Sequence, residues 1–392
     1  MKTKVRLKHI IVFAILIPII FFTACWNYVE LDNRSLVAAV GLDQGDDDKI
    51  ELSVQVIESG KLSKQGGSDE QAFAVYSAQG RTVFEAVREM TMTSDRKLFW
   101  QHNNLLIIGE GLAKKGVAQY TDFFIRDHES RARSWVVICE GTAKKMLKKQ
   151  GVVEKIPAGE ISSLIKSSEA TSKSAKIDLH NLQVNFTDKN VSSLTSWLQL
   201  AKTSEEKDSP VFELTGAAVL KHDKFICRLD RFETRGVLWI TDEINSGIIV
   251  VDSPDKEREP VGIEIISAKS KMRAQKVKDE FKIIVDISMI GNLGDQYGHG
   301  DLSTHEKLQS LENLVALEII KETQMALDKI QTECVSDVFG FGGAIHRKDS
   351  KAWSKIEPEW EKILPLLDVV VTADVQINRS GLVGESIHDK AD

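Results

Sequence analysis

The stretch EFKIIVDISMIG, residues 280–291, decides how the C-terminal third of the chain folds, because its apolar and polar side chains alternate. Its apolar positions are Phe281, Ile283, Val285, Ile287 and Met289. Since successive side chains of a strand point to opposite faces, this spacing predicts a strand with one buried and one solvated face. Such a strand is typical of an antiparallel sheet that is covered on one side only.

The neighbours of this strand complete an α+β domain over 259–392. They are a strand over 261–274, a helix from Ser303 to about Cys334, a helix over 351–364 and a strand over 368–377. Ser303 and Glu306 have the spacing of a capping box, which marks the start of a helix. The order strand, strand, helix, helix, strand predicts an antiparallel sheet with helices packed on one face.

Residues 25–205 alternate between strand and helix patterns, which predicts an N-terminal mixed α/β domain. We expect strands over 35–43, 49–57, 103–110 and 134–141, and helices over 81–92, 111–127, 142–150, 158–169 and 191–200. Thr142 is a candidate N-cap for the helix that follows it.

Two polar stretches predict the remaining boundaries. KTSEEKDSP (202–210) has linker composition, and SPDKEREP (253–260) is a second candidate. Between them, strand patterns over 211–220, 224–229 and 235–251 predict a small β-rich middle domain, which we place at 206–258.

The N-terminus predicts a lipoprotein signal peptide over 1–24. Residues 1–9 are basic, and residues 10–22 are uncharged. Thirteen helical residues reach about 20 Å, short of the roughly 30 Å hydrocarbon core of a bilayer. Cys25 follows directly and is the predicted site of diacylglycerol attachment. A plain signal peptide and a short uncleaved anchor are the alternatives.

The net charge of the mature chain is consistent with a tether made by lipid. Removal of residues 1–24 leaves 47 basic and 58 acidic residues, a formal net charge of −11. A chain of this sign is not drawn as a whole to nucleic acid or to anionic lipid.

The other cysteines are Cys139, Cys227 and Cys334. They are isolated and lack C-x-x-C spacing, so they match neither a metal site nor a disulfide framework. We expect buried free thiols.

No motif for catalysis, cofactors or metals stands out. The chain lacks a nucleophile elbow, a zinc-protease motif, a P-loop and a Rossmann glycine pattern. His299 lies between Asp295 and Asp301, but a solvated loop is the preferred interpretation. The acidic turn at 43–48 lacks the spacing of an EF-hand. The prediction is a chain without catalytic, cofactor or metal residues.

Three stretches of the sequence form a recognisable pattern. The first is C-W-N-x-x-E-L from Cys25, followed by V-G-L-D ending at Asp43. The pattern residues of the other two are Gly109, Glu110, Leu112, Ala113, Arg126, Asp127, Gly141, Ala143, Gly216, Lys224, Leu229, Glu233 and Thr234. The sequence DVFGFG (337–342), Trp353 and Trp360 extend the pattern over nearly the whole mature chain. In this pattern the chain resembles the Ger(x)C family, the C subunits of nutrient germinant receptors of endospore-forming bacteria.

The resemblance implies a non-enzymatic lipoprotein with three domains of mixed α/β folds. It implies a place on the outer face of the spore's inner membrane, beside integral membrane A and B subunits that respond with it to nutrients. One departure is the run Asn292, Leu293 and Gly294, where the family tends to have a glutamate.

Four polar residues in the matched stretches need a separate interpretation. Arg126, Asp127, Glu233 and Arg235 are expected to be structural, in buried or half-buried pairs near domain junctions. An interface role is the weaker alternative.

An extracytoplasmic solute-binding lipoprotein of a transporter is the competing function. It would share the anchor and the acidic mature chain. Such proteins usually have two lobes of repeated parallel βαβ units, which the β-rich middle and the one-faced C-terminal sheet do not favour. An anchored hydrolase is a third class, which the sequence disfavours because no catalytic motif stands out in it.

Overall fold

The computed structural model describes residues 34–58, 71–94, 96–127, 129–151, 154–188, 191–202, 210–255, 258–278, 280–297, 301–302 and 304–379. The predicted signal segment, Cys25 and His299 lie outside the described residues. Within the described ranges, no helix combines the length and the apolar character needed to cross a bilayer.

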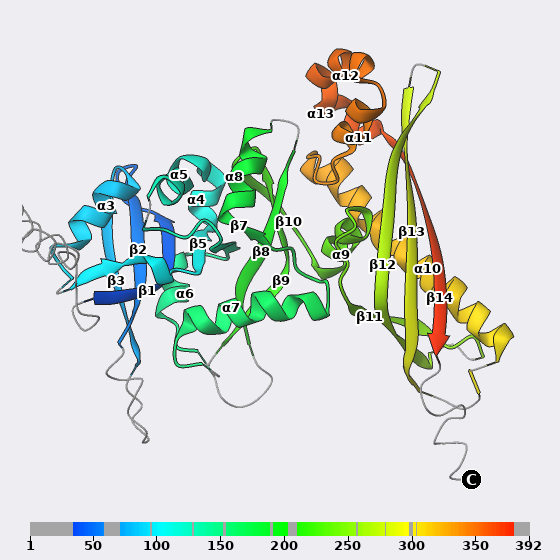
Figure 1. The fold of residues 1–392 in the computed structure, drawn as a ribbon, viewed down its shortest axis with the longest axis horizontal. Helices are drawn as coiled ribbons and strands as arrows, with labels where there is room; N and C mark the ends of the chain where they lie inside the picture. Colours follow the sequence, from blue (N-terminus) through cyan, green and yellow to red (C-terminus); the bar gives the residue numbers. More distant parts are fainter. Residues whose placement is uncertain are drawn as a thin grey trace, which may run out of the picture.

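The N-terminal half is built on one large mixed sheet (Figure 1). Its strands are β1 (Arg34–Gln44), β2 (Ile50–Ile57), β3 (Phe73–Gly80), β4 (Lys97–Phe99), β5 (Leu105–Gly109), β6 (Trp135–Cys139), β7 (Ile177–Asp178), β8 (Ser193–Ala201), β9 (Val211–Lys221) and β10 (Lys224–Leu229). The order is β10-β9-β8-β6-β5-β1-β2-β3, with β4 on β1 and β7 on β6. The central strands β1, β5, β6 and β8 are parallel, and antiparallel pairs extend the sheet on both sides.

Helices cover both faces of this sheet, which is why its central strands are apolar on both sides. In β5, Leu106 and Ile108 enter one core, while Leu105 and Ile107 enter the other. The first core contains α3 (Val83–Met90), α4 (Glu110–Lys115), α5 (Ala118–Arg126) and α8 (Leu179–Thr187); the second contains α6 (Ala143–Lys148) and α7 (Pro157–Ser167). The predicted mixed α/β organisation is confirmed.

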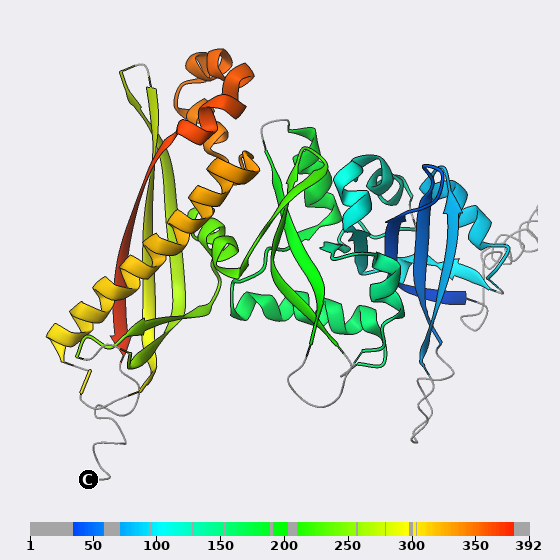
Figure 2. The same cartoon turned by 180° about the vertical axis from the view of Figure 1, so that it is seen from behind.

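The C-terminal part is a four-stranded sheet with one long helix on one face (Figure 2). Its elements are β11 (Gly247–Asp252), β12 (Pro260–Val277), β13 (Glu280–Gln296), α10 (His305–Lys329), the π-helical turn η5 (Ile330–Cys334) and β14 (Asp368–Arg379). The alternation in β13 is confirmed: Ile283, Val285, Ile287 and Met289 are buried in the core that includes α10.

The last strand corrects the prediction of an antiparallel sheet. β14 pairs in parallel with β13, from Lys282 opposite Asp368 onward. The reason is that α10 and the helices after it return the chain to the start of β13, as a crossover connection does. The C-terminal sheet is therefore mixed, and the fold as a whole is α+β.

Short helices connect α10 to β14. They are α11 (Phe341–Lys348), α12 (Ser350–Ile356) and α13 (Trp360–Ile363), with the 3₁₀ turns η6 (Glu357–Glu359) and η7 (Leu364–Leu366). The single helix expected over 351–364 is broken at Pro358, because proline lacks the N–H that an α-helix interior requires. Two further 3₁₀ turns are η3 (Trp100–His102) and η4 (Ser168–Ala170).

Two segments adopt the opposite secondary structure to the prediction. Most of the helix expected over 191–200 is instead β8 (Ser193–Ala201), which is buried on both faces and so lacks a period of two. Residues 235–240, expected as a strand, belong to α9 (Arg231–Ile240). Asp230 and Glu233 form a capping box that starts α9, and this D-x-x-E signal was present in the sequence.

Two helix boundaries also differ. The helix expected over 111–127 is divided at Gly116, whose φ is +120°. The turn at Asp223 is inserted there: Val117 N donates to Asp223 O at 2.9 Å. The first residue of α10 is His305 and its N-cap is Thr304, whereas the predicted capping box required Ser303, which lies outside the described residues.

The segment 206–258 does not form a sheet of its own among the described residues. β9 and β10 extend the large sheet, and β11 belongs to the C-terminal sheet. α9 lies between them, and its core also contains Ala217, Val219 and Leu229 of the large sheet. The two parts thus share apolar packing, while the domain boundaries proposed at 205/206 and 258/259 stay predictions.

Candidate functional site

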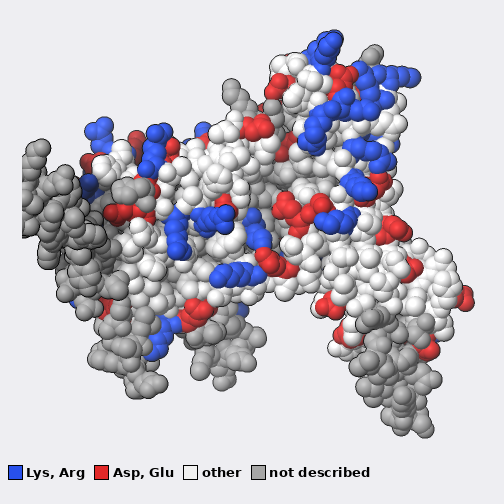
Figure 3. Space-filling view, viewed as in Figure 1, with Lys and Arg blue, Asp and Glu red and all other residues white. Residues whose placement is uncertain are grey.

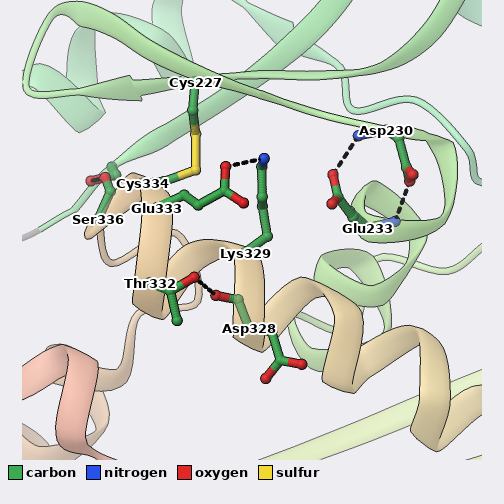
Figure 4. Close-up of a disulfide and its surroundings, with 10 residues drawn as sticks. Cys227, Asp230, Glu233, Asp328, Lys329, Thr332, Glu333, Cys334 and Ser336 are labelled. Carbon is green, nitrogen blue, oxygen red and sulfur yellow. Dashed lines mark hydrogen bonds and ion pairs between the residues drawn. A yellow bond between two sulfur atoms is a disulfide. The ribbon is translucent and has the colours of Figure 1, made fainter.

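The junction between the two sheets is where covalent, ionic and polar links between distant segments gather. It consists of the end of β10, α9, the C-terminal half of α10, η5 and the loop before α11. Figure 4 shows the disulfide at its centre. Since these segments come from both halves of the chain, the junction fixes one half against the other.

A disulfide joins Cys227 of β10 to Cys334 at the end of η5, with 5.8 Å between the Cα atoms. This corrects the prediction that both are free thiols. The cysteines are 107 residues apart, and only the packing of η5 beside β10 brings them together. Cys139 is free and buried, as predicted, and burial raises the pKa of its thiol well above the usual value.

Charged groups surround the disulfide without forming a reactive set. Lys329 and Glu333 form an ion pair one helical turn apart. Asp230 and Glu233 complete the capping box: Glu233 N donates to Asp230 Oδ1 at 2.8 Å, and Asp230 N donates to Glu233 Oε2 at 2.7 Å. Burial raises the pKa of Glu233. Each charged group shown in Figure 4 therefore acts on a helix terminus or a helix surface.

A buried ion pair lies deeper in the junction, between α9 and α10. Arg235 Nε donates to Glu322 Oε2 at 2.8 Å, and Arg235 Nη2 donates to Glu322 Oε1. Trp239 Nε1 donates to the same Oε2 at 3.1 Å, and Arg235 Nη1 donates to Ile248 O at 3.0 Å. The side chains of Arg235 and Glu322 are only 3% and 1% exposed.

Close approach of the two helices makes this pair possible. A Cβ atom at Gly236 would lie 2.1 Å from Glu322 O, so only glycine fits there. Without a side chain at 236, α9 can lie against α10 at the level of the pair. Gly236 therefore determines the spacing at which Arg235 reaches Glu322.

Polar contacts extend the junction toward α11 and α13. Ser336 Oγ donates to Ser192 Oγ at 2.5 Å. Lys221 of β9 pairs with Glu361 of α13 at 2.9 Å. The buried carboxylate of Asp337 accepts the backbone N–H groups of residues 340–342 at 2.7 to 3.0 Å, and burial raises its pKa.

Of the glycines in FGFGG (339–343), Gly340 is the N-cap of α11, and Gly342 and Gly343 lie in its first turn. Gly340 has φ +78°, the left-handed conformation in which glycine is favoured.

A crevice of about 550 Å³ opens beside the junction. Trp135 and Phe339 supply aromatic walls, and Asp178, Asn181 and Glu243 supply polar groups. Among the described residues, no three His, Cys, Asp or Glu side chains are grouped as metal ligands.

The four polar residues singled out in the sequence have different environments. Arg235 forms the expected buried pair at a junction, although its partner Glu322 was not predicted. Glu233 caps α9. Arg126 is exposed and pairs with Asp122 within α5 at 2.6 Å, so it is neither buried nor at the junction. Asp127 is half-buried and accepts Glu129 N at 3.2 Å.

The run at which the sequence departs from the family pattern lies in the C-terminal sheet, away from the junction. Asn292 and Leu293 belong to β13, opposite Glu264 and Ile263 of β12, where they take part in strand pairing.

Besides Glu322, a second structural carboxylate, Asp43, was missed. Asp43 follows the V-G-L run of β1 and accepts Ala143 N at 2.7 Å and Lys144 N at 2.8 Å. It therefore caps α6 in place of Thr142, whose side chain makes no capping bond. Burial raises the pKa of Asp43. The separation of about one hundred residues explains why no local pattern revealed this cap.

Comparisons with known proteins agree with this architecture. The family model described as "Spore germination protein N-terminal domain" matches residues 27–199. The model described as "Spore germination B3/ GerAC like, C-terminal" matches residues 215–381. Together they cover nearly all of the described structure, in the same order.

Individual relatives and one solved structure match over most of their length. Spore germination protein KC of Bacillus subtilis (strain 168) is 26% identical over 96% of both chains. Spore germination protein B3 of the same organism is 24% identical over 92% of this chain and 95% of its own. The crystal structure of the GerBC protein shares the fold, with a TM-score of 0.58 at 18% identity over 86% of this chain and 96% of that one. The chain therefore belongs to the Ger(x)C family of spore germination proteins.

Proposed function

We propose that the chain is the lipid-anchored C subunit of a nutrient germinant receptor. The observation that carries the proposal is the match of both family models, in order, over residues 27–199 and 215–381. Relatives named as spore germination proteins match at nearly full length, so the whole chain, and not one shared module, supports this role.

In this proposal Cys25 carries the lipid, and the folded chain lies on the extracytoplasmic face of the spore's inner membrane. The sequence features in favour are the basic segment, the short apolar segment and the cysteine that follows. Two acyl chains hold a protein stably, since each buried CH₂ contributes about 0.8 kcal/mol. Integral membrane A and B subunits are the proposed partners.

The junction suits a subunit that works through contacts with other proteins. The disulfide and the Arg235–Glu322 pair hold the two halves in one relative orientation. We therefore propose a non-enzymatic role in which the chain offers fixed surfaces to its partners.

The deciding experiment is germination of spores that lack the gene, scored nutrient by nutrient, in a strain without a redundant paralogue. We expect loss of the response to one class of nutrient, while germination by unrelated triggers persists. A normal response to every nutrient would refute the receptor role. A growth defect on one imported solute would instead support the solute-binding alternative.

The anchor is tested separately by metabolic labelling with a radioactive fatty acid. Label should enter the wild-type chain and be absent from Cys25→Ala, because the thiol is the atom that forms the thioether. Label retained in Cys25→Ala would contradict the assignment of Cys25. Loss of the lipid should weaken the nutrient response without abolishing it, since contacts with membrane subunits can still recruit the chain.

A further inference from the structure

The charges of this acidic chain are segregated in three dimensions. Segments 271–286 and 341–356 together contain nine lysines and arginines against four acids, a net of +5, whereas the whole chain carries −7. The contact between Lys276 Nζ and Asp349 Oδ2, at 3.0 Å, joins the two segments. A positive region has therefore formed on a negative protein.

We call this region the basic pole. Its exposed cations are Lys271, Arg273, Lys276, Lys278, Arg347, Lys348, Lys351 and Lys355. They come from the far end of β12, the turn after it, α11 and α12. In Figure 3 the Lys and Arg atoms are densest over this part of the molecule, at the upper right.

Most of these cations are not neutralised by the protein itself. Lys276 pairs with Asp349, and Arg273 pairs with Asp286. Lys271 lies opposite Asp286 in the pairing of β12 with β13 and interacts with its charge. Within the described part of the chain, no salt bridge joins the remaining five cations to a carboxylate. Exposed acids also lie nearby: Glu280 starts β13, and Glu357 and Glu359 follow α12. The exposed cations of the basic pole therefore outnumber the acids of the same two segments.

The basic pole projects from the molecule, as contact with an extended surface requires. It projects at the end of the β12–β13 hairpin and over α11 and α12 (Figures 1 and 2). Val277, at the tip of the hairpin, is 49% exposed, so an apolar side chain lies among the cations. Cations around a projecting apolar side chain are typical of contact with anionic headgroups.

From these observations we infer that the basic pole binds the anionic phospholipid surface of the membrane to which the chain is tethered. The inference rests on the lipid anchor proposed above. β1 lies toward the opposite end of the long axis from the basic pole (Figure 1). The chain therefore lies lengthwise on the bilayer, with the lipid holding one end and the basic pole the other.

Tethering makes a weak electrostatic contact effective. Each lysine or arginine at an anionic surface strengthens binding about fivefold, and a tethered domain rebinds at high effective concentration. The attraction falls off within a Debye length of about 8 Å at physiological salt. Only the basic pole takes part, since the rest of the chain is acidic.

The test is sedimentation of the unlipidated mature chain, residues 25–392 with Cys25→Ala, with phospholipid vesicles. We expect binding to mixed phosphatidylglycerol–phosphatidylcholine vesicles and none to phosphatidylcholine alone. Lys348→Glu with Lys351→Glu should weaken binding at least about twentyfold. Added sodium chloride should also weaken it, and inorganic phosphate should have no further effect at matched ionic strength.

The matched control is Lys145→Glu with Lys148→Glu. These exposed lysines of α6 produce the same change in net charge on another surface, so binding should stay within about twofold of the parent chain. Circular dichroism establishes that each variant is folded, and Lys348→Gln with Lys351→Gln should give a smaller loss. Equal binding to phosphatidylcholine alone, equal effects of the two Glu pairs, or displacement by phosphate would each overturn the inference.

The vesicle test is independent of the receptor role. Absence of vesicle binding, together with loss of a nutrient response in the deletion strain, would refute membrane binding by the basic pole and leave the proposed function standing. Normal germination of the deletion strain would refute the proposed function and leave the vesicle result standing.

Discussion

Removal of one charge from the buried Arg235–Glu322 pair should lower the free energy of unfolding more than any substitution of a surface charge does. Glu322→Gln keeps the shape of the side chain but leaves the Arg235 guanidinium buried without a counterion. It also turns an amide NH₂ donor toward the arginine donors. Glu322 accepts three hydrogen bonds from Arg235 and Trp239, so the substitution disturbs all of them.

The magnitude follows from the burial of the pair. Removal of one partner of a buried ion pair typically costs about 3–5 kcal/mol. The side chains here are 3% and 1% exposed, which places them in that class and not among surface pairs, which contribute about 0–1 kcal/mol. We therefore expect Glu322→Gln to lower the free energy of unfolding by about 3–5 kcal/mol.

The assay is urea-induced unfolding of the unlipidated chain, followed by tryptophan fluorescence and extrapolated to water. The control is the double variant Arg235→Met with Glu322→Leu, which removes both charges and fills similar volume. It should lose only about 1–3 kcal/mol, the cost of leaving buried Trp239 Nε1 without its acceptor and Ile248 O without the Arg235 donor. Lys321→Gln, a loss of charge at the neighbouring exposed position of α10, should change little.

A loss below about 1 kcal/mol for Glu322→Gln would refute the reasoning, because it would place the pair among solvated ones. A double variant less stable than the single one would also refute it, since the cost would then come from lost packing and not from an uncompensated charge.

Three other perturbations probe the same framework. Cys227→Ala with Cys334→Ala should lower the free energy of unfolding by about 4–5 kcal/mol, as expected for a loop of 107 residues, and should abolish sensitivity to reductant in urea unfolding; an unchanged midpoint would contradict this. Gly236→Ala should lower the free energy of unfolding by at least about 2 kcal/mol, because its Cβ would meet Glu322 O at 2.1 Å. Gly111→Ala, whose Cβ would have nothing within 4 Å, should stabilise α4 by about 0.5–1 kcal/mol. Similar effects at both positions would contradict the close approach of α9 to α10. Burial raises the folded-state pKa of Asp43, so ionisation of Asp43 costs stability as pH rises through that pKa. The free energy of unfolding of the wild type relative to Asp43→Asn should therefore increase on acidification from neutral to about pH 4. The opposite trend in urea unfolding at several pH values would contradict this effect of burial.

Local patterns predicted the elements that are buried on one face and the strands that are short apolar runs. The alternation of β13 and the apolar runs of β5 and β6 appear in the structure as expected. Patterns failed where burial was complete or where signals conflicted. β8 is buried on both faces, so it carries no period of two, and the apolar run of α9 concealed the helix that its capping box begins.

The sequence could not predict the links of the junction because each of them joins residues far apart in the chain. Cys227 and Cys334 are separated by 107 residues, and Arg235 and Glu322 by 87. Each cysteine alone is typical of a buried thiol, and each charged residue alone is typical of a helix surface. Their pairing depends on the spacing of α9 and α10.

The sequence by itself determined the fold class, the resemblance to the Ger(x)C family and the candidate lipidation site, because these depend on local periodicity and on short motifs. The tertiary structure alone decided the disulfide, the buried ion pair, the parallel pairing of β14 and the gathering of cations into the basic pole. The physical reason is that hydrogen-bonding period and side-chain polarity act between near neighbours along the chain. The disulfide, the buried ion pair and the clustering of cations join residues that are far apart in the sequence. They are therefore fixed only once packing has brought distant segments together.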